Sequence, residues 1–361
     1  MGPGGGAGDR RARRRWDAVK SLAIVKPTVL TGDRPTGALH LGHYVGSLKN
    51  RVAMQDEYEV FVLIADMQAL TDNARQPERV RENILEVAYG YFAVGIDPTK
   101  ANVVIQSMVP ELAELYMYLS NLVGVGRVER NPTVKSEVQQ KGMSEHVPAG
   151  FFMYPVSQVA DIVGFGADVV PVGNDQMPMI ELTNEIVATF ASTYGTGVLK
   201  PVRALVPKVG RLPAPDGRSK MSKSLGNVLP LDASEVEIRD FVNSLYPGMD
   251  GRRIHEPGVI EGNVILTYLD AFDPDVAGLE ALKSRYAAGG IGDSELKKRL
   301  LPLLIDLILP LRERRRRLEQ DPGYVKHCLR AGTEAGRERA AQVLAAVKRA
   351  MGLNYAETIL N

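Results

Sequence analysis

Short apolar runs alternate with helical patterns from residue 24 to about residue 212. Each run is continuous and only a few residues long, as in strands buried on both faces. The expected strands are 28–31, 58–66, 102–106 and 168–172. The expected helices, where apolar residues recur every three or four positions, are 42–55, 77–94, 111–122 and 180–190. This alternation predicts an α/β fold, a doubly wound parallel (Rossmann-like) sheet suited to binding a nucleotide.

The pattern changes beyond residue 230, where no further strand is expected. Ser234 and Glu237 have the spacing of a helix capping box, and apolar residues follow at helical intervals. Further helices are expected at 275–286, 294–311 and 335–351. We therefore divide the chain into a disordered basic tail (1–23), a Rossmann-like catalytic domain (24–212), a mobile lysine-bearing loop (213–230) and a C-terminal helical domain (231–361).

The amino-acid composition excludes some classes of protein but does not indicate a reaction. The 361 residues carry a net charge of only +1, so any nucleic-acid surface must be local rather than global. A single cysteine, Cys328, excludes internal disulfides and cysteine-rich zinc sites, and we predict no protein-held metal. The most apolar stretch, 300–309, contains Pro302 and Asp306 and is too short to span a bilayer. We expect a soluble, cytoplasmic protein with no membrane contact.

The first segment with clear chemistry is His40-Leu41-Gly42-His43, which follows the first strand and a turn rich in Gly and Pro. A helix that begins near Gly42 directs its free N–H groups and positive dipole end toward the turn, where an anion can bind. Two imidazoles at this place can donate hydrogen bonds to phosphate oxygens.

The second such segment is Lys220-Met221-Ser222-Lys223-Ser224, preceded by a lead-in rich in Pro and Gly. A flexible loop that carries two ammonium groups can close on a polyphosphate and neutralise charge in the transition state. Together, in this order, the two segments resemble the paired motifs of class I aminoacyl-tRNA synthetases. The second motif matches without departure, and the first differs only by Leu41 in place of Ile.

The segment 154–162 bears on the amino-acid substrate. Tyr154, Gln158 and Asp161 are spaced to share one face of a helix. A carboxylate among Val159, Ala160 and Ile162 is costly to bury unless a partner donates a hydrogen bond to it. An aromatic substrate with an N–H or O–H group supplies such a donor.

This segment and the setting of the first motif resemble tryptophanyl-tRNA synthetases, with further matches from about residue 28 to 353. The resemblance implies that Asp161 accepts the indole N–H, that Tyr154 and Gln176 contact the substrate ammonium, and that Gln158 and Leu30 line the pocket. It implies ATP contacts from seven residues: Gly32, Arg34, Gly42, Gly173, Asp175, Met221 and Ser222. His40, His43, Lys220 and Lys223 take the catalytic roles. Asn174 replaces the usual Glu of the ribose-binding loop, and Gln158 stands where bacterial members commonly have Met.

The same Tyr-x-x-x-Gln-x-x-Asp pattern also resembles the pocket of tyrosyl-tRNA synthetases, because one acceptor serves an indole N–H and a phenol O–H alike. Two features favour tryptophan. Position 30 is Leu, where tyrosyl enzymes have Tyr, and the loop at 172–176 lacks their Gly-Gly-Ser-Asp-Gln sequence. A third alternative is a synthetase-like paralogue that binds tryptophan and ATP in a regulatory or partner role, although both motifs are intact.

The resemblance also implies partners and co-substrates: ATP with Mg²⁺, L-tryptophan, tRNA(Trp) and a second copy of the chain in a homodimer. The helical part carries an arginine run, which is either a solvated helix face or a contact for tRNA phosphates. Its members are Arg312, Arg314, Arg315, Arg316 and Arg317. Lys135 and Lys141 are both candidates for an additional lysine that contacts ATP.

Overall fold

The computed structural model describes residues 26–143, 146–206, 212–219, 221, 226–249 and 252–360. Within these ranges the chain forms one five-stranded sheet in which every neighbouring pair is parallel and the order is β3-β2-β1-β4-β5. The strands are β1 (Thr28–Asp33), β2 (Glu59–Ile64), β3 (Ala101–Ile105), β4 (Val169–Pro171) and β5 (Arg203–Leu205). The predicted doubly wound parallel sheet is confirmed, and its strand order reverses between β1 and β4, where such folds bind ligands.

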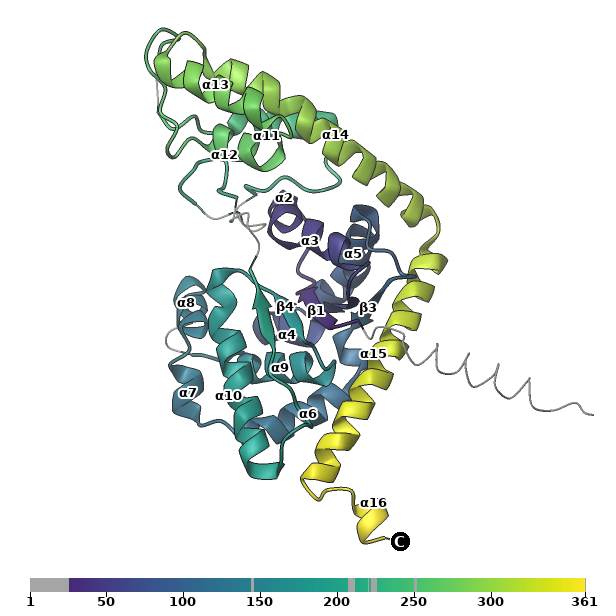
Figure 1. Ribbon diagram of the computed structural model, residues 1–361. Coiled ribbons are helices and arrows are strands. Elements are labelled where there is room, and N and C mark those ends of the chain that lie inside the picture. Colours follow the sequence, from purple (N-terminus) through teal and green to yellow (C-terminus); the bar gives the residue numbers. More distant parts are fainter. Residues whose placement is uncertain are drawn as a thin grey trace, which may run out of the picture.

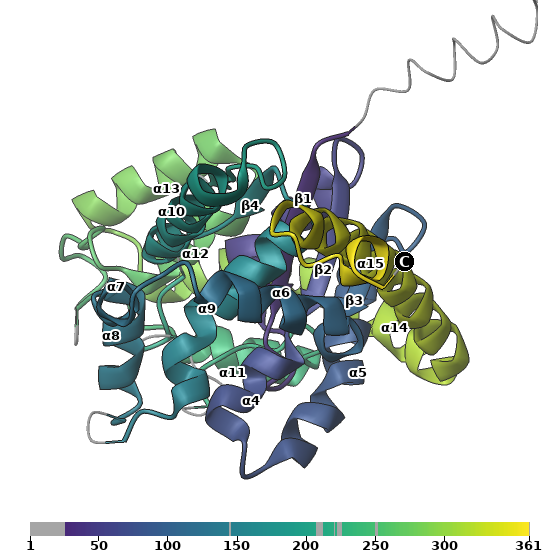
Figure 2. The same cartoon turned by 90° about the horizontal axis from the view of Figure 1, so that it is seen from below.

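Helices cover both faces of this sheet (Figures 1 and 2). The helices before β3 are α2 (Leu41–His43), a π-helical turn (Tyr44–Leu48), α3 (Lys49–Met54), α4 (Asp66–Asn73) and α5 (Pro77–Val94). Those between β3 and β5 are a 3₁₀ turn (Gln106–Met108), α6 (Pro110–Ser120), α7 (Val125–Glu129), α8 (Pro132–Gln140), α9 (Ala149–Gly164), a second 3₁₀ turn (Asn174–Gln176) and α10 (Met177–Tyr194).

Alternation along β2 explains why its sequence is apolar at nearly every position. Val60 and Val62 are buried with side chains of α3 and α5, whereas Phe61 and Leu63 are buried with side chains of α6, α9 and α10. Successive residues of a strand point to opposite faces, so a strand between two helical layers needs an apolar residue at each position.

The second part of the chain is helical, as the sequence predicts. Its helices are α11 (Glu235–Ser244), α12 (Val264–Phe272), α13 (Val276–Ala288), α14 (Asp293–Gln320), α15 (Pro322–Ala350) and α16 (Tyr355–Thr358). The capping box is present: the Glu237 backbone N–H donates to Ser234 Oγ at 3.3 Å, and the Ser234 N–H donates to Glu237 Oε2 at 2.7 Å. Among the described residues, no helix combines the length and the apolar character needed to cross a membrane.

The two longest helices, α14 and α15, connect the helical part to the sheet. In Figure 1 they run one after the other along one side of the molecule, and α15 lies beside β3. A Cβ atom built on Gly332 of α15 would lie only 2.5 Å from the Val103 carbonyl oxygen, so a side chain here is incompatible with this approach. The range 231–361, grouped as one helical part from the sequence, therefore contains a helix, α15, that covers the edge strand of the sheet.

Candidate active site

A cavity of about 260 Å³ opens at the carboxyl ends of the central strands, beside the reversal in strand order. Six residues expected at the site from the sequence line it: Leu30, Gly32, Gln158, Asp161, Gly173 and Gln176. The remaining walls come from neighbouring strands and helices: Thr31, Arg51, Leu63, Ala65, Gln68, Ile162, Val170, Pro171 and Val172. The lining thus combines apolar side chains with several polar ones, an arrangement that can orient a small molecule.

Asp161 is the buried acid of this cavity, with only 2% of its surface exposed. Gln106 Nε2 donates to both carboxylate oxygens at 2.9 and 2.8 Å, and Gln68 Nε2 donates to Oδ2 at 2.6 Å. Burial raises the pKa of Asp161 to about 7, against the opposing effect of the two amides. The expected burial of Asp161 is confirmed, but the donors in the structure are two protein amides, whereas the sequence analysis expected the donor to come from the substrate.

Sequence reasoning did not identify Gln68 and Gln106 as partners of Asp161. A signal existed, because Gln106 directly follows β3 and Gln68 lies in the first turn of α4, which follows β2. Carboxyl ends of adjacent parallel strands meet at one edge of the sheet, so polar residues there are candidates for a shared site.

A second polar cluster, also missed from sequence, supports the cavity wall at the end of β1. The guanidinium of Arg51 contacts Asp33 Oδ2 at 2.5 Å, and the Tyr91 hydroxyl donates to the same oxygen at 2.7 Å. Burial alone would raise the pKa of Asp33, but the facing charge of Arg51 holds it well below its usual range. Arg51 is 3% exposed and lines the cavity, so its charge is neutralised locally by a permanent carboxylate.

Tyr154 lies one helical turn before Gln158 on α9 but does not line the cavity. Its hydroxyl is buried without a hydrogen-bond partner among the described residues, and burial raises its pKa. The Arg34 guanidinium lies over its ring, 5.1 Å from the centroid, and pairs at 3.7 Å with Glu137 Oε2. The nearby Glu137 carboxylate also raises this pKa, so the phenol stays neutral.

His40 and His43 shape the start of α2, whose first residue is Leu41. The Gly42 backbone N–H donates to His40 Nδ1 at 3.1 Å, and the His40 N–H donates to His43 Nδ1 at 3.2 Å. The two rings lie 3.8 Å apart between centroids. Because each Nδ1 accepts a backbone hydrogen bond, the proton of each neutral ring resides on Nε2.

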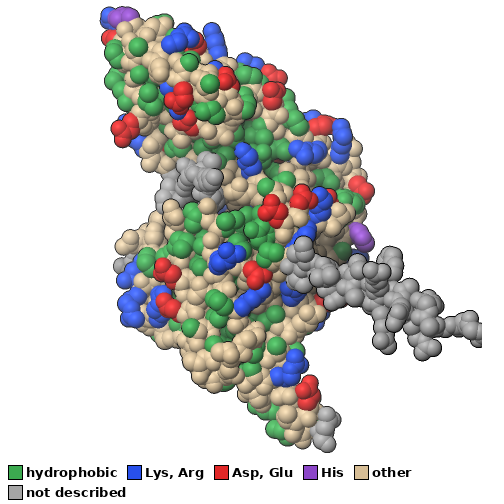
Figure 3. All heavy atoms as spheres, in the orientation of Figure 1, with side chains coloured by type: hydrophobic (Ala, Val, Ile, Leu, Met, Phe, Trp, Pro, Cys, Tyr) green, Lys and Arg blue, Asp and Glu red, His purple; other side chains and the backbone are tan. Residues whose placement is uncertain are grey.

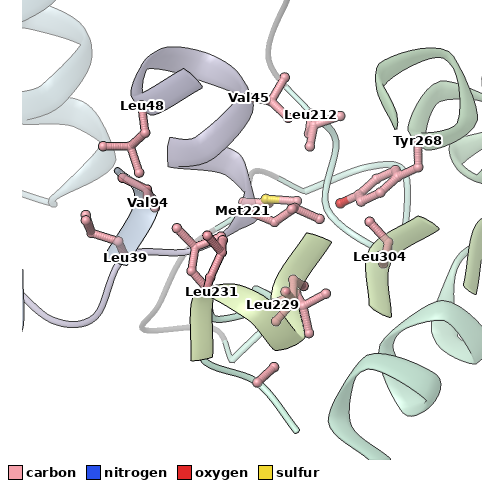
Figure 4. Packing of buried hydrophobic residues seen from close by; sticks show 14 of the residues in the cluster. Leu39, Val45, Leu48, Val94, Leu212, Met221, Leu229, Leu231, Tyr268 and Leu304 are labelled. Carbon is pink, nitrogen blue, oxygen red and sulfur yellow. The ribbon is translucent and has the colours of Figure 1, made fainter. Parts of the chain in front are cut away.

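Met221 of the second motif packs against the first motif. Lys220, Ser222 and Lys223 lie outside the described residues. A Cβ atom on Gly42 would lie 2.9 Å from Met221 Sδ, so Gly42 leaves room for this methionine. Figure 4 shows Met221 beside Leu229 and Leu231, with Leu39 and Val45 from the first motif's surroundings. The described part of the second motif is therefore placed next to the histidine helix.

The remaining predicted positions do not line the cavity. Asp175 is exposed in the 3₁₀ turn Asn174–Gln176, and its carbonyl oxygen accepts a hydrogen bond from the Thr133 hydroxyl at 2.9 Å. Lys135 is exposed on α8, whereas Lys141 pairs with Asp72 of α4 and lies 5.2 Å from the Phe151 ring centroid.

The arginines of the run on α14 differ in their exposure to solvent. Arg315 is largely buried, with contacts to Glu86 at 2.6 Å, Glu319 at 2.7 Å and Asp232 at 3.4 Å. Arg314 and Arg316 are exposed. On the face seen in Figure 3, Lys and Arg side chains alternate with Asp and Glu, so no single-sign patch dominates that face.

Comparisons with known proteins place the chain in a family. The family described as "tRNA synthetases class I (W and Y)" matches residues 25–307. A relative from Streptococcus mutans, named tryptophan–tRNA ligase, is 51% identical over 337 residues, 91% of this chain and 99% of the relative. One from Clostridium longisporum with the same name is 49% identical over 340 residues, 93% of this chain and 100% of the relative.

A solved structure agrees with these relatives. Tryptophanyl-tRNA synthetase from Campylobacter jejuni, complexed with ADP and tryptophan, superposes with a TM-score of 0.77 at 31% identity, covering 90% of this chain and 100% of that one. The fold, both signature segments and the relatives over nearly the whole length agree, and the chain belongs to the class I tryptophanyl-tRNA synthetases.

Proposed function

We propose that this chain joins L-tryptophan to tRNA(Trp) in two steps, with its own residues in the roles given below. The tryptophan carboxylate attacks the α-phosphate of ATP in line, forming the P–O bond of tryptophanyl-adenylate as the bond to pyrophosphate breaks. A terminal ribose hydroxyl of the tRNA then attacks the acyl carbon, and AMP leaves. The observation that carries this proposal is the buried Asp161 carboxylate in the wall of a cavity at the carboxyl ends of the central strands.

The indole ring would occupy the cavity of about 260 Å³, with its N–H donated to Asp161. Leu30 and Gln158 line the same cavity and would form its side walls. Gln176 in the cavity wall and the Tyr154 hydroxyl, one helical turn before Gln158 on α9, would accept hydrogen bonds from the substrate ammonium. This arrangement directs the substrate carboxylate toward the open rim, where ATP would bind.

ATP would bind between the first motif and the loop after β4. His40 and His43 would donate from Nε2 to phosphate oxygens, beside the N–H groups at the start of α2. Gly32 and Gly42 are assigned backbone contacts to the nucleotide, while Arg34 adds a positive charge. Gly173 and Asp175 would contact the ribose. Met221 and Ser222 would pack near the adenosine.

No protein nucleophile is needed, because both steps transfer groups between substrates. Acceleration would come from positioning and from cations that stabilise charge on the leaving pyrophosphate. Lys220 and Lys223 are assigned that role. Mg²⁺ would neutralise phosphate charge as part of the bound nucleotide. The described residues contain no group of three or more His, Cys, Asp and Glu side chains that could hold a metal ion.

We also propose that the chain binds tRNA, forms a homodimer with a second copy and acts in the cytoplasm. Exposed Arg314 and Arg316 on α14 would contact tRNA phosphates. Exposed Met117 and Val125, on α6 and α7, are 61% and 68% exposed and would be covered in a homodimer. The single, buried Cys328 is compatible with a reducing compartment.

The test is pyrophosphate exchange with tryptophan and tyrosine side by side, followed by charging of tRNA(Trp). Exchange that depends on tryptophan, and that Asp161→Asn reduces through a higher KM for tryptophan, supports the proposal. Lys223→Ala should lower kcat far more than it changes tryptophan binding. Tyrosine-dependent exchange would favour the tyrosyl alternative. Exchange without charging would favour a paralogue with another role.

A further inference from the structure

The hydrogen bonds to Asp161 come from neutral donors. Gln106 is completely buried at the end of β3, and Gln68 is 8% exposed in the first turn of α4. Between them they donate three hydrogen bonds, of 2.6 to 2.9 Å, to the two carboxylate oxygens. Buried carboxylates are usually paired with a cation, whereas the hydrogen bonds to Asp161 come only from neutral amides.

The Gln106 amide is fixed in one orientation. Its Oε1 accepts the Gln68 backbone N–H at 3.3 Å, so its Nε2 is the end that faces Asp161. The peptide N–H groups on either side are also held: that of Ile105 donates to Thr333 Oγ1 at 3.1 Å, and that of Ser107 donates to Asp66 Oδ1 at 2.9 Å. With both flanking groups anchored, Gln106 presents a donor, and not an acceptor, to the acid.

We propose that Gln68 and Gln106 are positioning residues that determine specificity, because their amides hold Asp161 as an ionised carboxylate that accepts but does not donate. This inference rests on the proposed role of Asp161 as the acceptor for the indole N–H. Gln106 does not line the cavity, so its influence on the substrate passes through Asp161 alone.

The ionised form matters because the two aromatic substrates differ in hydrogen-bonding capacity. An indole N–H is a donor only, whereas a phenol hydroxyl both donates and accepts. A protonated Asp161 can donate to a phenol oxygen, whereas an indole N–H then meets only a neutral carbonyl oxygen, which is a weaker acceptor than a carboxylate. Loss of the amides should therefore weaken tryptophan more than tyrosine and lower the discrimination between them.

The groups around Asp161 both favour and oppose the ionisation of its carboxyl. Burial raises the pKa of Asp161 to about 7, the like charge of Asp66 on α4 raises it further, and the two amides oppose both effects. Arg51 of α3 faces the same cavity, but its charge is paired with Asp33. Removing one amide should shift the carboxyl toward its protonated form at neutral pH.

The experiment is pyrophosphate exchange by the full-length Gln106→Leu and Gln68→Leu variants, with tryptophan and with tyrosine, across a pH series. We expect the KM for tryptophan to rise about tenfold near pH 7. We expect that rise to shrink toward the wild-type value by about pH 9, because Asp161 then ionises without help. The preference for tryptophan over tyrosine should fall in parallel, while the KM for ATP stays near the wild-type value.

Gln55→Leu is the matched control. Gln55 is equally buried, at 5% exposure, but its amide donates to the Val52 and Gly95 carbonyl oxygens, away from the cavity. A KM for tryptophan that is unchanged in both test variants, or raised by the same factor at every pH as in a packing defect, overturns the inference. Asp161→Asn separates the two levels. If Asp161→Asn leaves the KM for tryptophan unchanged, the proposed role of Asp161 is wrong. If Asp161→Asn raises this KM but the two glutamine variants leave it unchanged, only the inference about Gln68 and Gln106 is wrong.

Discussion

The backbone N–H of Leu41 donates to the carbonyl oxygen of Leu229 at 2.8 Å, and the Leu231 N–H returns a hydrogen bond to the Leu39 carbonyl oxygen at 3.1 Å. This pairing joins the start of the histidine helix to the chain that leaves the lysine-bearing segment. Two motifs far apart in sequence are thus held together by main-chain hydrogen bonds, which do not depend on the side chains of either motif.

The first prediction concerns the space that Gly42 leaves for Met221. In Gly42→Ala the new Cβ would lie 2.9 Å from Met221 Sδ and 3.0 Å from the His40 ring, so one of them must move. Overpacking of this kind costs about 1–3 kcal/mol, and we expect the KM for ATP in pyrophosphate exchange to rise about tenfold. Gly46→Ala is the control, because a Cβ there meets nothing within 4 Å. Equal KM values in the two variants would contradict the prediction.

The second prediction is a pH dependence of tryptophan binding in the unmodified protein. Because burial raises the pKa of Asp161 to about 7, the carboxyl is ionised above that pH and protonated below it. The KM for tryptophan should therefore increase as the pH falls through neutrality, measured by exchange at saturating ATP between roughly pH 5.5 and 8.5. A flat profile for tryptophan across this range would exclude a titrating Asp161 from the pocket.

The third prediction separates two roles within the arginine run of α14. Arg315 contacts Glu86 and Asp232, so Arg315→Ala should lower the free energy of unfolding by about 1–3 kcal/mol. Arg316→Ala removes an exposed charge and should leave stability unchanged while reducing the salt dependence of tRNA binding by about one unit of slope. Urea unfolding and filter binding over a salt series measure these quantities. If Arg315→Ala reduced the salt dependence and Arg316→Ala reduced stability, then Arg315, and not Arg316, would be the residue that contacts the tRNA.

The fourth prediction tests how α15 packs on β3. Gly332→Ala places a Cβ 2.5 Å from the Val103 carbonyl oxygen, a rigid backbone atom, and should destabilise the fold by about 1–3 kcal/mol. Gly323→Ala lies in the first turn of the same helix, where its nearest neighbour is Asp321 Oδ1 at 3.4 Å. There the helix propensity of alanine should stabilise by up to about 1 kcal/mol. Thermal unfolding of both variants would reveal whether the signs differ.

Much of the fold follows from local pattern. The range 77–94 predicted for a helix is that of α5, and the four expected strands coincide with β1 to β4 within a few residues. β5 was not expected, because Arg203–Leu205 is only three residues long, begins with a charged residue and is not buried. The helices expected at 294–311 and 335–351 extend to Asp293–Gln320 and Pro322–Ala350. Their additional turns are charged or rich in small residues, and such segments lack the apolar stripe by which a helix is recognised.

The sequence by itself determined the fold class, the two signature segments and the buried acid, because each is encoded in residues close together in the chain. Only the tertiary structure decided which groups meet Asp161, because Gln68 and Gln106 come from separate strand ends, 93 and 55 residues away. It likewise decided that Arg51 neutralises Asp33 and that Arg315 differs from its neighbours on α14. Hydrogen bonds and ion pairs depend on distances of a few ångströms, and a periodic pattern specifies a face of a helix or strand, not its partner.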